Sequence, residues 1–142
     1  MGSRRKSREY ALQILYLIDI AKMDTEKAIR AVSVDPSVEE PIQKFTRALV
    51  EGTRANVVEL DAAIVNYAKN WELSRMAALD RNILRLGAYE LLFDTTTPVS
   101  VIINEAVEIA KMFSTDESGK FVNGILDRIK DDRKQDGIKE KD

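Results

Sequence analysis

The chain has 142 residues, 44% of them hydrophobic and 32% charged, and this composition is typical of a soluble globular domain. It contains neither Cys nor His, which excludes disulfides, thiolate metal sites and catalysis by an imidazole or a thiol. The net charge of −2 is polarised. The first eight residues carry four positive charges and no acid, whereas the rest of the chain carries 18 basic residues against 24 acidic ones.

No stretch of the sequence approaches the ~20 apolar residues that a membrane span needs. The basic N-terminus is followed by neither the apolar segment nor the small-residue cleavage site of a secretory signal. We therefore expect a cytoplasmic protein that does not insert into a membrane.

The first half of the chain predicts three helices. The first, over residues 3–23, carries apolar residues at the spacing of a core-facing stripe, namely Ala11, Ile14, Leu15 and Ile18. Asp24 is a suitable N-cap for a short helix over residues 25–33. Pro41 suits the first turn of a third helix, which its apolar periodicity extends without a break to residue 70.

The second half predicts three longer helices, over residues 81–93, 100–113 and 115–130. Asp80 is placed to cap the first of them, and Ser114 with Glu117 has the spacing of a capping box for the last. The connector of residues 71–79 contains one short helical turn. Within it, Trp71 is expected to fill the core between the two halves of the molecule.

No segment convincingly predicts a strand, so the expected fold is all-α, with about seven helices in two packed bundles. We expect one domain over residues 1–131, divided into an N-terminal subdomain of about 1–70 and a C-terminal subdomain of about 71–131. The almost entirely polar residues 132–142 are expected to form a disordered tail.

The basic cluster at the N-terminus is the first candidate site. Arg4 and Arg8 are one helical turn apart, so they share a face, which Arg5 and Lys6 flank. Guanidinium groups on a rigid surface suit phosphate oxygens. By charge alone the cluster is more often a solvated basic helix start than a binding site. Positive charge at a helix N-terminus opposes the helix dipole, which shifts some weight toward an anionic ligand. Farther along the helix, an amide for a base edge and a ring for stacking are present at Gln13 and Tyr16.

Four carboxylates are candidates for catalysis or metal binding: Asp80, Glu90, Glu105 and Asp127. None of them forms a pair with metal-ligand spacing, and Arg81 and Arg85 stand within helical reach of Glu90. We therefore expect helix caps and ion pairs at these positions. No metal, no cofactor and no enzymatic activity are predicted.

Three stretches of the sequence are distinctive in combination: RRKSREYALQILY near the N-terminus, W-x3-R followed by LDRNILRLGAYELLF, and PVSVIINEAVEIAKMFSTDESGKFVNGILDRI. They resemble the NusB family of bacterial transcription antitermination factors, whereas residues 22–65 agree with that family only in helix lengths and patterning. The resemblance implies an all-α fold of two helical subdomains. It also implies binding of boxA, a short single-stranded RNA element of ribosomal RNA leaders. The partner would be a small-subunit ribosomal protein that serves as an elongation factor within the antitermination complex of RNA polymerase.

Site residues follow from the resemblance at matching positions. It implies RNA contacts along the first helix at Arg4, Arg5, Lys6, Arg8, Gln13 and Tyr16. A second part of the RNA surface is implied at Glu117, Lys120 and Phe121. Contacts with the ribosomal protein are implied at Asp80, Arg81, Leu84 and Glu90. Lys6 and Ser7 stand where some relatives carry more Arg, which implies weaker RNA binding by this chain alone.

Two alternatives stay open at this point. The chain could be a protein-binding adaptor or a homodimer in which the Arg cluster is buried at an interface. It could also be a module related to the N-terminal region of ribosomal RNA cytosine methyltransferases, although it has no Gly-rich cofactor loop and no catalytic Cys.

Overall fold

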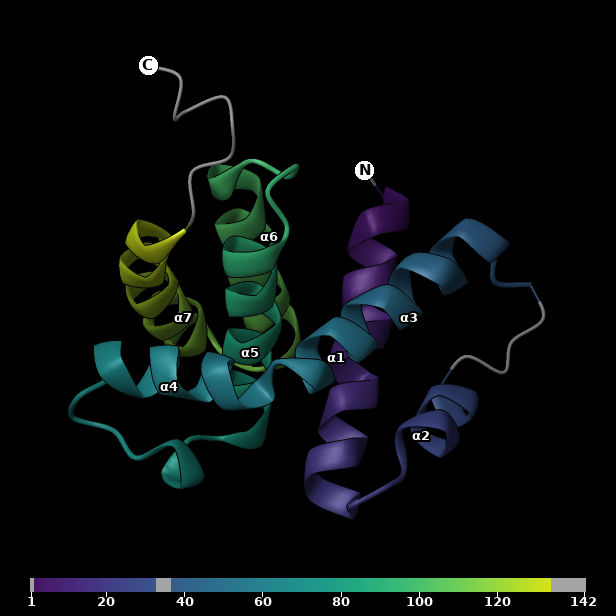
Figure 1. Ribbon diagram of the computed structural model, residues 1–142, viewed down its shortest axis with the longest axis horizontal. Coiled ribbons are helices and arrows are strands. Elements are labelled where there is room, and N and C mark those ends of the chain that lie inside the picture. Colours follow the sequence, from purple (N-terminus) through teal and green to yellow (C-terminus); the bar gives the residue numbers. More distant parts are fainter. Residues whose placement is uncertain (1, 33–36, 134–142) are drawn as a thin grey trace.

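The computed structural model describes residues 2–32 and 37–133. These residues form seven α-helices and two short 3-10 segments without any strand (Figure 1), which confirms the all-α prediction. The helices are α1 (Gly2–Ala21), α2 (Thr25–Val32), α3 (Glu40–Ala55), α4 (Val57–Tyr67), α5 (Ala78–Phe93), α6 (Val99–Phe113) and α7 (Asp116–Ile129), and the 3-10 segments are η1 (Leu73–Arg75) and η2 (Lys130–Asp132). Residue 33 of the predicted second helix and residues 134–142 of the predicted tail lie outside the described part. No described helix has both the length and the apolar character needed to cross a bilayer.

Two hydrophobic cores organise the molecule. The first joins α1, α2 and α3, and it contains the predicted stripe of α1, whose four members Ala11, Ile14, Leu15 and Ile18 are all buried. The second joins α4, α5, α6 and α7. Leu12 of α1 lies in the second core, and Leu86 of α5 lies in the first. Helices α1 and α5 therefore hold the two bundles together.

The single long helix predicted over residues 41–70 is wrong, because it breaks at Asn56 into α3 and α4. The side-chain amide of Asn56 donates to the carbonyl oxygen of Gly52 at 2.8 Å, and its backbone N–H donates to the same oxygen at 3.2 Å. Such local side-chain bonds offer the backbone an alternative to the helical ladder. Beyond the break, Leu60 and Ile64 share the core of α5 to α7, while the subdomain boundary near residue 70 stays a prediction.

Two predicted helix caps are also corrected. Helix α5 begins at Ala78, so Asp80 is the third residue of its first turn and not its cap. Helix α7 is capped by Thr115, whose hydroxyl oxygen accepts the N–H of Ser118 at 3.0 Å. The capping-box prediction at Ser114 was therefore wrong by one residue, and Glu117 contributes only its negative charge to the first turn.

Helix α5 is the central element, because it packs against α1, α3, α4, α6 and α7. It is buried nearly all round, at Arg81, Asn82, Ile83, Leu84, Leu86, Gly87, Ala88, Glu90 and Leu91. Gly87 permits the close approach of α7, since a Cβ atom there would lie 2.7 Å from Leu126. Charged residues on such a helix must find partners within the fold. Arg85 accordingly binds Asp61 of α4 at 2.7 and 3.0 Å, and not Glu90 as the spacing predicted.

Candidate functional site

The basic end of α1 presents two side chains to solvent. Arg4 and Lys6 are both exposed. The Arg4 guanidinium lies 4.0 Å from the centre of the Phe45 ring on α3, a cation–π geometry. These two residues carry the accessible positive charge of the predicted patch.

The other two basic residues of the patch turn inward. Arg5 forms a bidentate pair with Glu105 of α6, at 2.6 and 2.8 Å, and its side chain keeps 30% exposure. Arg8 is only 4% exposed, and its Nε atom donates to both carboxylate oxygens of Glu90, at 2.7 and 2.9 Å. The expectation that Arg8 is part of an exposed patch is therefore wrong. Where α1 packs against α5, a buried guanidinium is stabilised by pairing with a carboxylate.

The ion pair between Arg5 and Glu105 also affects the titration of its carboxyl group. The hydrogen bond from Arg5 lowers the pKa of Glu105 below its usual value of 4.5, although partial burial opposes this shift, and the nearby charges of Arg5 and Arg8 add to the lowering. The carboxylate therefore stays ionised in the folded protein, which keeps Arg5 engaged.

The second candidate region centres on an aromatic pair, which the connector before α5 and helix α7 bring together. Trp71 and Phe121 meet edge to face, with ring centres 5.6 Å apart and planes at 68°. Trp71 is 55% exposed, so the prediction that it fills the core is wrong. Beside the pair lies a hollow of about 580 Å³, hereafter the first hollow, lined by Trp71, Arg75, Met76, Ala77, Asp80, Glu117, Ser118, Lys120 and Phe121.

The first hollow gathers residues that the sequence assigned to two different partners. Glu117, Lys120 and Phe121 were implied as RNA contacts and Asp80 as a protein contact, and all four line it. The Oδ1 atom of Asp80 is buried and, within the described residues, has no hydrogen-bond partner. A buried acceptor of this kind favours a ligand or water that donates a hydrogen bond.

The remaining residues implied as contacts with the ribosomal protein lie inside the fold. Leu84 is fully buried, Glu90 is 1% exposed and accepts from Arg8, and Arg81 is 9% exposed. None of the three can meet a protein across a surface, because α5 is covered on nearly every side. The periodicity of a helix identifies its faces, but it does not reveal how many of them other helices cover.

Arg81 instead holds in place the connector whose residues line the first hollow. Its Nη1 atom donates to the carbonyl oxygens of Leu73 and Met76, both at 3.1 Å, and its Nε atom donates to Asp19 at 2.8 Å. These bonds fasten the connector that carries Trp71 to both α5 and α1. Burial alone would raise the pKa of Asp19, but the hydrogen bonds from Arg81 and Asn82 outweigh it and lower the pKa.

Helix α1 links the two candidate surfaces. In the view of Figure 1, its basic N-terminus lies at the top of the molecule and the connector with η1 lies at the bottom. Between them, Gln13 is exposed and Tyr16 is half-buried. Asp19, one turn beyond Tyr16, accepts hydrogen bonds from Arg81 and Asn82 at the start of α5. The predicted RNA residues therefore do not form one cluster: six of them lie along α1, and the other three, on α7, line the first hollow.

Two residues of this region were not predicted from the sequence as site residues. Trp71 and Arg75 line the first hollow, and the available signal was a large aromatic residue beside charged ones in a short connector. The carboxylates form ion pairs instead: Glu105 with Arg5, Glu90 with Arg8 and Asp127 with Lys130. Across residues 2–32 and 37–133, no cluster of three acidic side chains is arranged to hold a metal ion.

The fold and these surfaces define a small all-α protein with an arginine-rich first helix fastened to a central buried helix, and with an aromatic hollow near the start of that helix. The model of the NusB family matches residues 5–131, and the chain belongs to this family. It is 46% identical to the transcription antitermination protein NusB of Elusimicrobium minutum, over 94% of this chain and 97% of that protein.

Solved structures agree with this assignment. NusB of T. maritima superposes with a TM-score of 0.86 at 37% identity, over 92% of both chains. A chain from a crystal structure of the antitermination factors NusB and NusE in complex with dsRNA gives a TM-score of 0.84 at 26% identity, over 93% of this chain and 98% of that one.

Proposed function

We propose that this chain is a transcription antitermination factor of the cytoplasm that binds boxA-type single-stranded RNA together with a small-subunit ribosomal protein. In the antitermination complex of RNA polymerase it would promote processive transcription of ribosomal RNA operons. It acts by binding and not by catalysis. The relatives named as transcription antitermination proteins support this proposal, as does a structural neighbour from a complex of NusB and NusE with dsRNA.

One observation carries the proposal: two exposed cations at the start of α1 and the partly exposed pair of Trp71 and Phe121 are both accessible to a ligand, and Asp19 ties the far end of α1 to the start of α5. Arg4 and Lys6 supply charge for phosphates. Trp71 and Phe121 supply rings on which unpaired bases stack. Phosphate contacts give salt-sensitive affinity, whereas stacking and contacts with base edges give preference among sequences.

The site residues implied by the resemblance fall into two groups according to their exposure to solvent. Exposed or half-buried residues are proposed as RNA contacts, namely Arg4, Arg5, Lys6, Gln13, Tyr16, Glu117, Lys120 and Phe121. Arg8 is proposed to position α1 through Glu90. Asp80 remains the proposed contact with the ribosomal protein, and Arg81, Leu84 and Glu90 would support it by building α5.

The test is a titration of the full chain with labelled boxA-type RNA and with a scrambled RNA of the same length, at two salt concentrations. We expect tighter binding of the boxA-type RNA, further tightening when the ribosomal protein is added, and weaker binding at higher salt. Equal affinity for both RNAs would contradict the proposal. A dimer that size-exclusion chromatography finds unchanged by RNA would favour an adaptor instead.

A further inference from the structure

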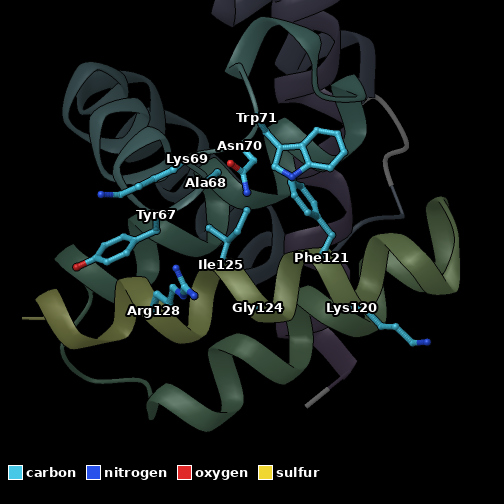
Figure 2. Close-up of a pocket in the computed structure, with 10 residues that line it drawn as sticks. All are labelled: Tyr67, Ala68, Lys69, Asn70, Trp71, Lys120, Phe121, Gly124, Ile125 and Arg128. Carbon is cyan, nitrogen blue, oxygen red and sulfur yellow. The ribbon is translucent and has the colours of Figure 1, made fainter.

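A second hollow lies next to the first, on the face where the end of α4 meets α7 (Figure 2). Its volume is about 320 Å³, within the range of roughly 300–1,000 Å³ that small-ligand sites occupy. It is lined by Tyr67, Ala68, Lys69, Asn70, Trp71, Lys120, Phe121, Gly124, Ile125 and Arg128. The two hollows share Trp71, Lys120 and Phe121.

The charged side chains that line the second hollow are all positive. Lys69, Lys120 and Arg128 are exposed, and no acidic residue contributes to its lining. Lys120 is 4.0 Å from Glu117, a loose contact between exposed groups. Within residues 2–32 and 37–133, neither Lys69 nor Arg128 has an ion-pair partner. At its far end, the Tyr67 hydroxyl donates to Asp132 at 3.0 Å. The lining of the hollow is therefore complementary to an anion, whereas the Asp132 carboxylate lies beyond Tyr67 at the far end.

Gly124 forms part of the lining, and no close neighbour requires glycine at this position. A Cβ atom at this position would meet no other atom within 4 Å, whereas one at Gly52, Gly87 or Gly119 would lie 2.2 to 2.9 Å from a neighbour. Glycine inside a helix is unfavourable compared with alanine. In Figure 2, Gly124 and Ile125 lie between Trp71 at one end and Arg128 at the other. The missing side chain leaves room above α7, which favours a ligand in that space.

We propose that the second hollow binds one unpaired nucleotide of the RNA, with its base stacked on Trp71 above Gly124 and its phosphate held by Arg128 and Lys69. This inference rests on the proposed RNA-binding function and extends the RNA path from the first hollow around Trp71. Stacking on an aromatic ring accepts any base, because every base has a π face. The site would therefore add affinity for single strands without adding strong sequence preference.

Trp71 supplies the direct measurement, because it is the only tryptophan in the sequence. Its fluorescence is recorded while the full chain is titrated with boxA-type single-stranded RNA, and the anisotropy of the labelled RNA is recorded in parallel. We expect the fluorescence to be quenched along the same binding curve as the anisotropy. Binding seen by anisotropy without quenching would overturn the second hollow and leave the proposed function intact. The absence of any binding would overturn both.

Two leucine variants distinguish RNA binding in the second hollow from RNA binding in the first. Gly124→Leu fills the second hollow without changing charge, and Asn123→Leu places the same side chain one residue away, at an exposed position that does not line it. We expect Gly124→Leu to weaken RNA binding about tenfold and to reduce the quenching, consistent with the loss of one stacked base. We expect Asn123→Leu to match the wild type in both measurements.

Two results would place the ligand elsewhere. Unchanged quenching and affinity in Gly124→Leu would show that the base stacks in the first hollow, and this would overturn the inference. Quenching by the ribosomal protein alone, with none from RNA, would assign the second hollow to that protein and would also overturn it. Circular dichroism of both variants checks the fold, and Gly124→Ala provides a smaller substitution at the same position.

Discussion

Arg8 and Glu90, separated by 82 positions in the sequence, form a buried ion pair in which the Arg8 Nε atom donates to both carboxylate oxygens. The pair ties α1 to the central helix α5. The Arg8 Nη1 atom also lies 3.6 Å from Glu105, which pairs with Arg5. The network holds the start of α1 in place, so that Arg4 and Lys6 are presented from a fixed helix. Arg8 is therefore structural, Arg5 is held by Glu105 but keeps 30% exposure, and Arg4 and Lys6 are fully available to a ligand.

We predict that Arg8→Ala lowers the free energy of unfolding by about 3–5 kcal/mol, because it leaves the Glu90 carboxylate buried without its partner. Urea denaturation measures the change. Lys6→Ala, at an exposed position of the same helix, is the control and should change the free energy by less than about 0.5 kcal/mol. A double variant, Arg8→Met with Glu90→Leu, should recover most of the loss. Equal stability of Arg8→Ala and Lys6→Ala would contradict the structural role.

The stability of the protein should fall in acid through Glu105. The hydrogen bond from Arg5 lowers the pKa of Glu105 below 4.5 in the folded state. A carboxyl group whose pKa is lowered by folding stabilises the protein above its unfolded pKa, and this stabilisation is lost as the pH falls through the folded value. We predict that Glu105→Gln is less stable than the wild type at neutral pH, and that this difference shrinks below about pH 4.

Urea denaturation of the wild type and of Glu105→Gln, between neutral pH and about pH 3, measures how the free energy of unfolding of each depends on pH. The comparison checks the direction of the pKa shift of Glu105. Glu59→Gln removes the same charge at an exposed position of α4, and it should change the free energy of unfolding by less than about 0.5 kcal/mol. A constant difference between wild type and Glu105→Gln at every pH would rule out the proposed contribution of Glu105.

Two helical glycines should respond in opposite ways to the same substitution. At Gly52, an added Cβ atom would lie 2.2 Å from the Cζ atom of Tyr89, whereas at Gly124 it would meet nothing within 4 Å. We predict that Gly52→Ala destabilises the protein by about 1–3 kcal/mol through overpacking. Gly124→Ala should stabilise it by about 0.5–1 kcal/mol through helix propensity. Thermal denaturation of both variants decides the matter, and a shift in the same direction would contradict the packing seen at Gly52.

The local sequence pattern predicted which segments form helices, but it did not predict which of their side chains the fold buries. The stripe of α1 at Ala11, Ile14, Leu15 and Ile18 is buried as predicted, since it follows directly from helical spacing. The break at Asn56 was missed because apolar periodicity continues on both sides of it, while the hydrogen bond to Gly52 that accompanies it is formed by one side chain.

Errors in the predicted site share one physical origin. Arg8 and Glu90 read as surface residues because charge usually lies outside. Only the tertiary fold brings them together across 82 positions, which no local spacing can reveal. Trp71 was misread in the opposite direction, since large aromatic residues are usually well buried and it is 55% exposed. A buried ion pair and an exposed tryptophan both depend on neighbours that are distant in sequence.

The exposed cations of α1 give the last prediction. Arg4 and Lys6 are the accessible charges of the basic cluster, so each would neutralise one phosphate of a bound strand. We predict that Arg4→Ala and Lys6→Ala each weaken RNA binding without unfolding the protein. Each should also reduce the slope of log K against log salt concentration by about 0.7, as expected for one phosphate contact with a single strand.

Lys27→Ala is the matched control, because it removes one positive charge from an exposed position on α2, a helix that carries none of the proposed RNA contacts. It should leave the slope of log K against log salt concentration unchanged, even though the net charge of the protein changes equally. If all three variants shifted the slope by the same amount, the effect would come from overall charge and not from contacts at α1. A reduced slope confined to Arg4→Ala and Lys6→Ala would place phosphates of the RNA at the start of α1.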